Sequence, residues 1–227
     1  MTNRPVDFDE FSKSYDDLLR QATGFFASDE SYFASYKVSI VRRELSDDPE
    51  NLLEFGCGIG RNIPFLAHAF PSSRLVGTDI SRGSLDFAQK INPGVEFHLE
   101  PHSVNNNDLF DVIFIAGVFH HIPVDQRREV LATLRQRLRP DGSVFIFEHN
   151  PFNPVTRRIV SNCRYDEDAV LLSPRNLRLL LGDAGFRVLK HRYCLFFPPR
   201  FRAFTRFESQ LGWVPLGGQY WVKAARS

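Results

Sequence analysis

Two acidic residues frame a glycine-rich turn in the first half of the chain. Glu54 precedes three glycines at alternate positions, and Asp79 stands at the tip of the next apolar run. The glycines are Gly56, Gly58 and Gly60. Because glycine has no Cβ, such a turn can bend sharply and approach a ligand closely. A carboxylate at Asp79 can accept hydrogen bonds from both hydroxyls of a ribose. This layout predicts a nucleotide-binding strand-helix-strand unit.

The spacing of the glycines and the charge of Glu54 narrow the class of nucleotide. A dinucleotide fingerprint places its third glycine where this chain has Arg61. The turn also lacks the Lys-Ser/Thr pair of a phosphate-binding loop, which excludes that motif. A carboxylate at Glu54 would repel a pyrophosphate and attract a cationic ligand. We therefore expect a cationic nucleotide and keep a nicotinamide-dependent oxidoreductase as an alternative.

Size and composition point to one ordinary α/β domain. The chain has 227 residues, 43% hydrophobic and 24% charged, with a net charge of +1. Near-neutral charge gives no support for a nucleic-acid partner. Three widely spaced cysteines fit a reducing compartment, the N-terminus lacks a signal-peptide pattern, and no apolar stretch of about 18 residues occurs. We expect a cytoplasmic protein, and the oligomeric state stays open.

Periodicity and turn signals predict the elements that carry these residues. Apolar residues at three- and four-residue intervals within 8–45 indicate helices, so residues 1–48 are expected to form a helical cap and 49–227 the core domain. Strands are expected at 51–55, 74–80, 95–99, 110–116, 144–148, 187–196 and 220–224, with helices at about 60–69, 81–92, 124–138 and 173–184. The link before the last strand is too short for a helical crossover. The prediction is a doubly wound, mostly parallel seven-stranded sheet whose last strand is antiparallel.

Five segments in this order resemble the class I S-adenosylmethionine-dependent methyltransferases of the small-molecule type. They are LLEFGCGIGR, GTDIS, FDVIFIAGVFHHIP, LRPDGSVFIFEHN and LLLGDAGFRV. The resemblance implies a Rossmann-like fold and S-adenosylmethionine as cofactor. This ligand carries a sulfonium and an ammonium group and no phosphate, so it suits a site with two carboxylates.

The resemblance also implies roles for individual residues. The methionine part of the cofactor would be lined by Glu54, Gly56, Cys57, Gly58 and Gly60. Asp79 would hold the ribose, Ile80 would cover the adenine, and the backbone of Ala116 and Gly117 would meet the methionine ammonium. Many members carry an acid after the third strand that bonds the adenine amino group, and here Pro101 and His102 occupy that stretch. We expect His102 or Ser103 to replace it.

Methyl transfer from a sulfonium is an in-line displacement, so the site must align and desolvate the acceptor. Candidate catalytic residues follow the fourth and fifth strands: His120, His121, Glu148 and His149. Adjacent residues in an extended segment point to opposite sides, so one of the two neighbouring histidines is expected to face away. The spacing of these residues matches no metal-ligand pattern, and no metal is expected.

Substrate contacts are expected from the ends of the chain and from one long loop. Tyr15 in an amphipathic helix is a candidate lid residue, and Asn150 follows the fifth strand. The segment 150–172 is long for a loop, and its Arg157 and Arg158 suit a carboxylate or phosphate. Residues 195–216 place Phe201, Phe204, Phe207 and Leu211 near one helical face, which fits packing, a lipid-like substrate or weak membrane contact.

The resulting functional prediction is methyl transfer to a small molecule, which is anionic, glycan-linked or lipid-like, with O-methylation favoured. A catalytically silent cofactor-binding or partner-binding module is the main alternative, because the binding motif and the transfer chemistry are separable. A nucleic-acid methyltransferase is disfavoured by the near-neutral charge and by the absence of an Asn/Asp-Pro-Pro-aromatic tetrad.

Overall fold

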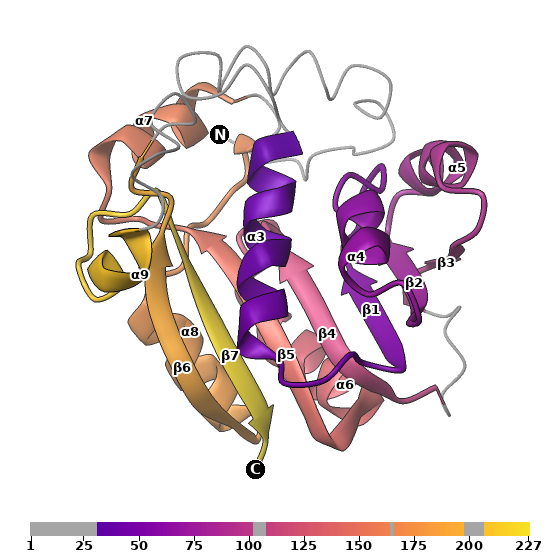
Figure 1. Ribbon diagram of the computed structural model, residues 1–227. Helices are drawn as coiled ribbons and strands as arrows, with labels where there is room; N and C mark the ends of the chain where they lie inside the picture. Colours follow the sequence, from indigo (N-terminus) through magenta and orange to yellow (C-terminus); the bar gives the residue numbers. More distant parts are fainter. Residues whose placement is uncertain (1–30, 102–107, 164–165, 198–206) are drawn as a thin grey trace.

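A computed structural model describes residues 31–101, 108–163, 166–197 and 207–227. Its seven-stranded sheet has the order β3-β2-β1-β4-β5-β7-β6 (Figure 1). The strands are β1 (Asn51–Phe55), β2 (Arg74–Asp79), β3 (Glu96–Leu99), β4 (Phe110–Ala116), β5 (Leu138–His149), β6 (Phe186–Cys194) and β7 (Gln219–Arg226). β1 to β5 pair in parallel, and β7 runs antiparallel between β5 and β6. The predicted Rossmann-like sheet with an antiparallel last strand is confirmed.

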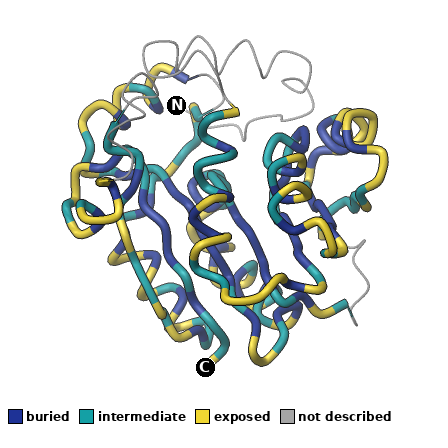
Figure 2. The backbone as a smooth tube through the Cα atoms, viewed as in Figure 1, coloured by how far each residue is buried: buried dark blue, intermediate teal, exposed yellow. Residues whose placement is uncertain are grey.

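Helices cover both faces of this sheet. α3 (Ser31–Glu44), α4 (Ile63–Ala69) and α5 (Arg82–Ile91) lie in front in Figure 1, and α6 (Arg127–Arg137) and α8 (Pro174–Asp183) lie behind. α7 (Pro154–Asn162) lies at the upper left of the same view, and the short α9 (Glu208–Leu211) lies below it on the left side. The central strands are buried from both sides, as Figure 2 shows.

The central strands carry apolar side chains on both faces, which is why two layers of helices can pack on them. In β4, Val112 and Phe114 join the core cluster under α3 and α4, whereas Ile113 and Ile115 join the cluster under α6 and α8. α3 packs in the first cluster through Val38 and Val41. The proposed boundary between residues 48 and 49 stays a prediction, since residues 1–30 lie outside the described residues.

Two segments differ from the sequence prediction. The run Arg139-Pro140-Asp141-Gly142 was expected to end a helix, but it lies within β5, where the pairing with β4 shifts register between Leu138 and Ser143. The segment 150–172 was expected to be an irregular loop, but it contains α7. Asn153 caps that helix by accepting the backbone N–H groups of Val155 and Thr156, and Pro154 occupies its first turn.

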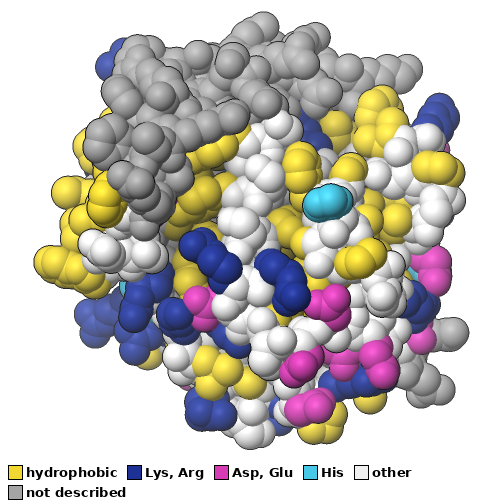
Figure 3. All heavy atoms as spheres, in the orientation of Figure 1, with side chains coloured by type: hydrophobic (Ala, Val, Ile, Leu, Met, Phe, Trp, Pro, Cys, Tyr) yellow, Lys and Arg dark blue, Asp and Glu magenta, His cyan; other side chains and the backbone are white. Residues whose placement is uncertain are grey.

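The surface that Figure 3 shows carries charges of both signs. Lys and Arg side chains gather toward the edge formed by β6 and β7, and Asp and Glu side chains lie nearer the lower loops. Among the residues that the structure describes, no helix is long and apolar enough to cross a membrane. In the aromatic segment 195–216, Trp213 and Leu216 are exposed. Phe201 and Phe204 fall outside the described residues, so lipid contact there stays a prediction.

Candidate functional site

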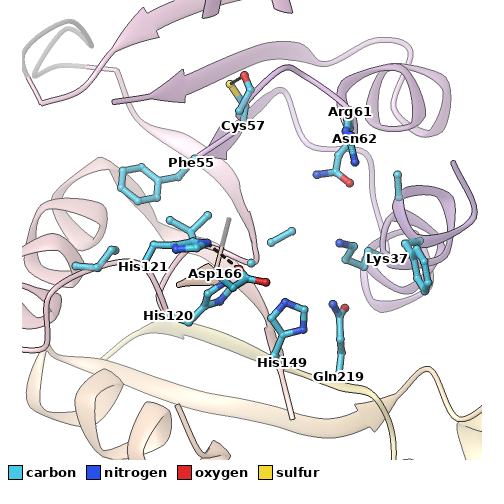
Figure 4. Close-up of a pocket in the computed structure, with 18 of the residues that line it drawn as sticks. Lys37, Phe55, Cys57, Arg61, Asn62, His120, His121, His149, Asp166 and Gln219 are labelled. Atoms are coloured by element: carbon cyan, nitrogen blue, oxygen red, sulfur yellow. Dashed lines mark hydrogen bonds and ion pairs between the residues drawn. The ribbon is translucent and has the colours of Figure 1, made fainter. Parts of the chain in front are cut away.

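A cavity of about 590 Å³ opens where the carboxyl ends of β1, β2, β4 and β5 meet (Figure 4). A doubly wound sheet binds its ligands at this edge. The glycine turn and Asp79 form one side, and the residues after β4 and β5 form another. Further walls come from α3, α7 and residues 195–197. Segments far apart in the sequence therefore enclose one space.

The glycine turn is fixed against Asp79 by backbone hydrogen bonds. The N–H of Gly58 donates to Asp79 Oδ2 at 2.7 Å, and the N–H of Ser81 donates to Oδ1 at 2.9 Å. Gly56 has a φ of +70°, and a Cβ there would lie 2.4 Å from Cγ2 of Val118. Only glycine fits at this position, because both the positive φ and the close approach exclude a side chain. The turn thus lies directly against the segment that follows β4.

Glu54 lies buried beneath the turn, and one of its oxygens lacks a partner. Oε1 accepts a hydrogen bond of 2.6 Å from Nδ2 of Asn62, but Oε2 has no hydrogen-bond partner among the residues that the structure describes. Burial raises the pKa of Glu54 to about 8, against the opposing effects of Asn62 and Lys37. A buried carboxylate with a free oxygen and a raised pKa favours a nearby cation. This suits the ammonium group of S-adenosylmethionine.

Lys37 enters the cavity from α3, which the sequence analysis did not foresee. Its side chain lines the cavity on the side opposite the histidines (Figure 4). Burial lowers the pKa of its ammonium group, while Glu54 acts in the opposite direction. Lysines on helices are usually exposed to solvent, so nothing in the sequence around Lys37 indicated that its side chain lies in a cavity. Lys37 thus places an amine on the wall of the cavity opposite the histidines.

Glu148 organises a tight turn after β4. Its Oε1 accepts the backbone N–H groups of Val118 at 3.2 Å and Phe119 at 2.8 Å, and its Oε2 lies 2.6 Å from Nδ1 of His120. The turn closes with a hydrogen bond from the N–H of His121 to the carbonyl of Val118. The rings of His120 and His121 consequently lie on the same side, with centroids 4.2 Å apart.

The expectation that one of these histidines would face away is therefore wrong. Both line the cavity, as does His149 at the end of β5. Strand alternation does not apply within a tight turn, where successive side chains can converge. Glu148 itself does not line the cavity and is buried under the turn.

Asp166 joins the histidines from the segment after α7. Its Oδ1 lies 3.5 Å from Nε2 of His120 and 3.4 Å from Nε2 of His121, and Nδ1 of His121 lies 3.3 Å from Asp168. The sequence analysis missed both acids. They stand in the run Asp166-Glu167-Asp168, which has the composition of a solvated turn. Only the fold brings this run to the ends of β4 and β5.

The side chains of His120, His149, Glu148 and Asp166 shift one another's pKa values. Burial disfavours a charge on His120, but Glu148 and Asp166 outweigh it and raise its pKa to about 10. Burial would raise the pKa values of Glu148 and Asp166, but the neighbouring histidines hold both below the ordinary range. Burial, together with the charge on His120, lowers the pKa of His149 to about 4. This wall of the cavity therefore combines a charged His120 and its two carboxylate partners with the neutral imidazole of His149.

Other expected site residues fall into three groups. Cys57, Gly58, Asp79, Ile80, Ala116 and Gly117 line the cavity together with Gly56, and Ile80 is 66% exposed there. Glu54 and Gly60 do not line it; Glu54 is buried behind the turn, and a Cβ at Gly60 would lie 2.8 Å from Asn92. Tyr15, His102 and Ser103 lie outside the described residues, so their roles stay predictions. Glu100, directly after β3, lines the cavity and pairs with Arg137 at 2.5 Å.

The structure does not bring the three remaining substrate candidates to the cavity. Asn150 is buried, and its side chain bonds the carbonyls of Pro215 and Gly217 and the N–H of Phe152. Its polar atoms are used to hold the chain after β5. Arg157 and Arg158 are exposed on α7, which faces the cavity with Val155, Thr156 and Ile159 instead. The helix that the sequence analysis missed points its arginines outward.

Comparisons with known proteins agree with this geometry. Residues 53–144 match the family model described as a methyltransferase domain. The chain is 29% identical over 118 residues to a malonyl-[acyl-carrier protein] O-methyltransferase of Halalkalibacterium halodurans, covering 48% of this chain and 43% of the relative. It is 28% identical over 99 residues to a trans-aconitate 2-methyltransferase of Methylobacterium nodulans, covering 43% and 38%. The chain spans less than two thirds of the length of the curated relatives it matches.

Solved structures share the fold over nearly the whole chain. One is a SAM-dependent methyltransferase of Thermotoga maritima, described as a possible histamine N-methyltransferase. It superposes with a TM-score of 0.68 at 17% identity, covering 97% of this chain and 98% of that one. The matched family model runs from within β1 to within β5. This range contains the glycine turn, Asp79 and the turn from Val118 to His121, called the histidine turn below. Residues 53–144 thus match a methyltransferase domain, and the fold that surrounds them is that of S-adenosylmethionine-dependent methyltransferases.

Proposed function

We propose that the protein transfers a methyl group from S-adenosylmethionine to an oxygen of a small, anionic acceptor. One observation carries the proposal: a single cavity connects the glycine turn and Asp79 with the histidines after β4 and β5. A volume of about 590 Å³ suits a small-molecule ligand. The cofactor supplies an activated methyl group, so the protein mainly has to bind, align and desolvate the two reactants.

The cofactor side of the cavity is assigned to the residues around the glycine turn. Asp79 would accept hydrogen bonds from the ribose hydroxyls, and Ile80 would cover one face of the adenine. Glu54 would face the methionine ammonium, and its unpartnered oxygen supports that role. Gly56, Cys57, Gly58, Ala116 and Gly117 would provide the close backbone surface along the methionine part.

The acceptor side is assigned to the opposite walls. His120, His121 and His149 would contact the acceptor near its reacting oxygen, and Glu148 would position the turn that holds the first two. Lys37 would pair with a negative charge on the acceptor, because its ammonium group faces the cavity. The names of the two sequence relatives, which refer to malonyl and trans-aconitate acceptors, support an acidic small molecule.

Calorimetry of S-adenosylmethionine binding tests the cofactor assignment. Asp79→Asn retains an acceptor oxygen for the turn but removes the charge, so we expect weaker binding by about 10- to 100-fold, from charged hydrogen bonds of about 1.5–3 kcal/mol. Asp86→Asn, at an exposed position on α5, is the matched control and should leave the affinity unchanged. Absence of binding by the wild-type protein, or equal binding by the Asp79 variant, would reject the assignment.

A second experiment tests the acceptor class. Formation of S-adenosylhomocysteine is followed with a panel of small carboxylates and with their neutral amides. We expect turnover of carboxylates, and Lys37→Met should raise the KM for them while leaving cofactor affinity in place. Turnover restricted to neutral acceptors would contradict the anionic assignment. Cofactor binding without turnover in a whole metabolite extract would favour the catalytically silent alternative.

A further inference from the structure

Three side chains at one wall of the cavity converge as metal ligands do. His120, His121 and Asp166 each offer one ligand atom, and these three atoms lie within 4.8 Å of one another. Oδ1 of Asp166 is 3.5 Å from Nε2 of His120 and 3.4 Å from Nε2 of His121. Ligands about 2.0–2.2 Å from a tetrahedral zinc ion are separated by roughly 3.4 Å, so these spacings fit a shared ion. We propose that His120, His121 and Asp166 bind one divalent transition-metal ion.

The atoms behind these ligands support the proposal independently. A histidine that binds a metal through Nε2 usually donates its Nδ1–H to a carboxylate, which fixes the ring and its tautomer. Both histidines have this arrangement. Nδ1 of His120 lies 2.6 Å from Glu148, and Nδ1 of His121 lies 3.3 Å from Asp168. Each Nε2 is thereby left to face Asp166 and the cavity.

The two segments that carry the ligands are joined by backbone hydrogen bonds. The N–H of Val170 donates to the carbonyl of His120 at 2.8 Å. The guanidinium group of the buried Arg127 donates to the carbonyls of Ile122 and Val170, each at 2.8 Å. Asp166 and the histidine turn are therefore held in a fixed relation, as a preformed metal site requires.

The ligand types define the class of metal. Two imidazoles and one carboxylate suit Zn²⁺, Fe²⁺, Co²⁺ or Ni²⁺ better than Mg²⁺ or Ca²⁺, which prefer oxygen ligands alone. Three protein ligands leave coordination positions open toward the cavity, the arrangement of catalytic metal sites. Binding through Nε2 requires both rings to be neutral.

The role of this ion rests on the proposed methyl transfer. A Lewis acid at this wall would hold an acceptor oxygen in line with the methyl group, and if that oxygen belongs to a hydroxyl it would lower the hydroxyl pKa so that the proton leaves to solvent before transfer. Lys37 and His149, which also line the cavity, would then lie beside an acceptor that is bound to the metal. The spacing of the histidines and Glu148 gave no metal-ligand pattern, because the third ligand, Asp166, stands in the segment 150–172, where only the arginines were taken as candidates.

Titration of the chelator-treated full chain with Co²⁺ alone tests the site. We expect one equivalent to bind with the visible absorption bands of histidine-coordinated cobalt, and Zn²⁺ to displace it. His121→Gln and Asp166→Asn should each weaken Co²⁺ binding by more than about 100-fold, and Asp168→Asn by about 10- to 100-fold, because it changes an outer partner. Glu167→Gln, an exposed neighbour in the same acidic run, is the matched control and should bind as the wild type does.

Binding of S-adenosylmethionine by the same variants shows whether they are folded. Loss of Co²⁺ binding in a variant that retains the cofactor supports the site. Failure of the wild type to bind a stoichiometric ion, or unchanged Co²⁺ affinity in the folded His121 and Asp166 variants, overturns it. Because the metal titration contains no cofactor or acceptor, its outcome is separate from that of the proposed methyl transfer.

Discussion

At the residue scale, Glu54 is a buried acidic side chain whose charged form a cationic ligand would stabilise. The side chain is 1% exposed, and its Oε2 has no partner within the described part of the chain. Such an arrangement is costly in the free protein, because a buried carboxylate is poorly solvated. The cost is consistent with a site that is completed only when a cation binds.

The pKa of Glu54 gives the first prediction. Its folded value of about 8 lies above the ordinary value, so in the free protein it contributes stability at low pH that is lost as the pH rises toward 8. A cofactor ammonium favours the carboxylate, so binding below about pH 8 should release a proton. The affinity of the wild type for S-adenosylmethionine, relative to that of Glu54→Gln, should therefore rise between about pH 6 and 8.

Calorimetry in buffers with different ionisation enthalpies measures the released proton directly. The titration of the ligand's own amino group is common to both proteins, so the comparison with Glu54→Gln removes it. If the two pH profiles run parallel, Glu54 does not face the cofactor ammonium.

The residues that could be predicted from the sequence are those in local motifs. Glu54, the glycines and Asp79 stand at a spacing that the chemistry itself requires, and His149 ends a recognisable strand. Lys37 and Asp166 stand in no such motif. In the sequence, Lys37 resembles a solvent-exposed lysine of a helix, and Asp166 resembles an acidic residue of a polar turn. Their place in the cavity depends on contacts between distant segments, which a local pattern does not encode.

At the scale of elements, the contact between the glycine turn and the histidine turn couples the two halves of the site. Gly56 leaves room for the side chain of Val118, which directly precedes the histidine turn. Any Cβ at Gly56 must therefore displace that turn or the backbone of the glycine loop. The position of the glycine turn therefore constrains the position of the turn that carries His120 and His121.

Substitution of Gly56 by alanine gives the second prediction. We expect a loss of unfolding free energy of about 1–3 kcal/mol from the positive φ, with added cost from a Cβ only 2.4 Å from Val118. Affinity for S-adenosylmethionine should fall as well. Gly182→Ala is a control of opposite sign, because it lies in α8 with no atom within 4 Å of an added Cβ, and should stabilise by about 0.5–1 kcal/mol. Chemical denaturation measures both, and equal stability of the Gly56 variant and the wild type would contradict the argument.

The two errors at the scale of elements have physical causes. Arg139-Pro140-Asp141-Gly142 has the composition of a turn, and the structure uses that composition for an irregularity inside β5. α7 was missed although Asn153-Pro154 is a good helix start, because the helix has only nine residues and lies within a longer connecting segment. Strands β1, β2 and β4 were predicted within a residue, since continuous apolar runs indicate buried parallel strands.

Over the whole molecule, the cofactor side and the acceptor side of the cavity have different origins. The residues proposed to bind the cofactor lie within residues 53–144, which match the family model. Much of the remaining wall comes from outside that range, from α3, α7, His149, Asp166 and residues 195–197. The sequence could therefore predict the fold and the cofactor, whereas the acceptor depends on segments without a shared motif.

Ligand-dependent thermal stability gives the third prediction, because a ligand that binds only the folded chain stabilises all of it. S-adenosylmethionine at 100 times its Kd should add about 2.7 kcal/mol to the free energy of unfolding, which raises the Tm by roughly 5–10 °C for a domain of this size. Asp79→Asn at the same ligand concentration should show a clearly smaller shift, whereas Asp86→Asn should match the wild type. NADH should leave the Tm unchanged, since Arg61 stands where a dinucleotide-binding turn has its third glycine. A shift with NADH and none with S-adenosylmethionine would instead support the oxidoreductase alternative, and differential scanning calorimetry of the full chain distinguishes the two.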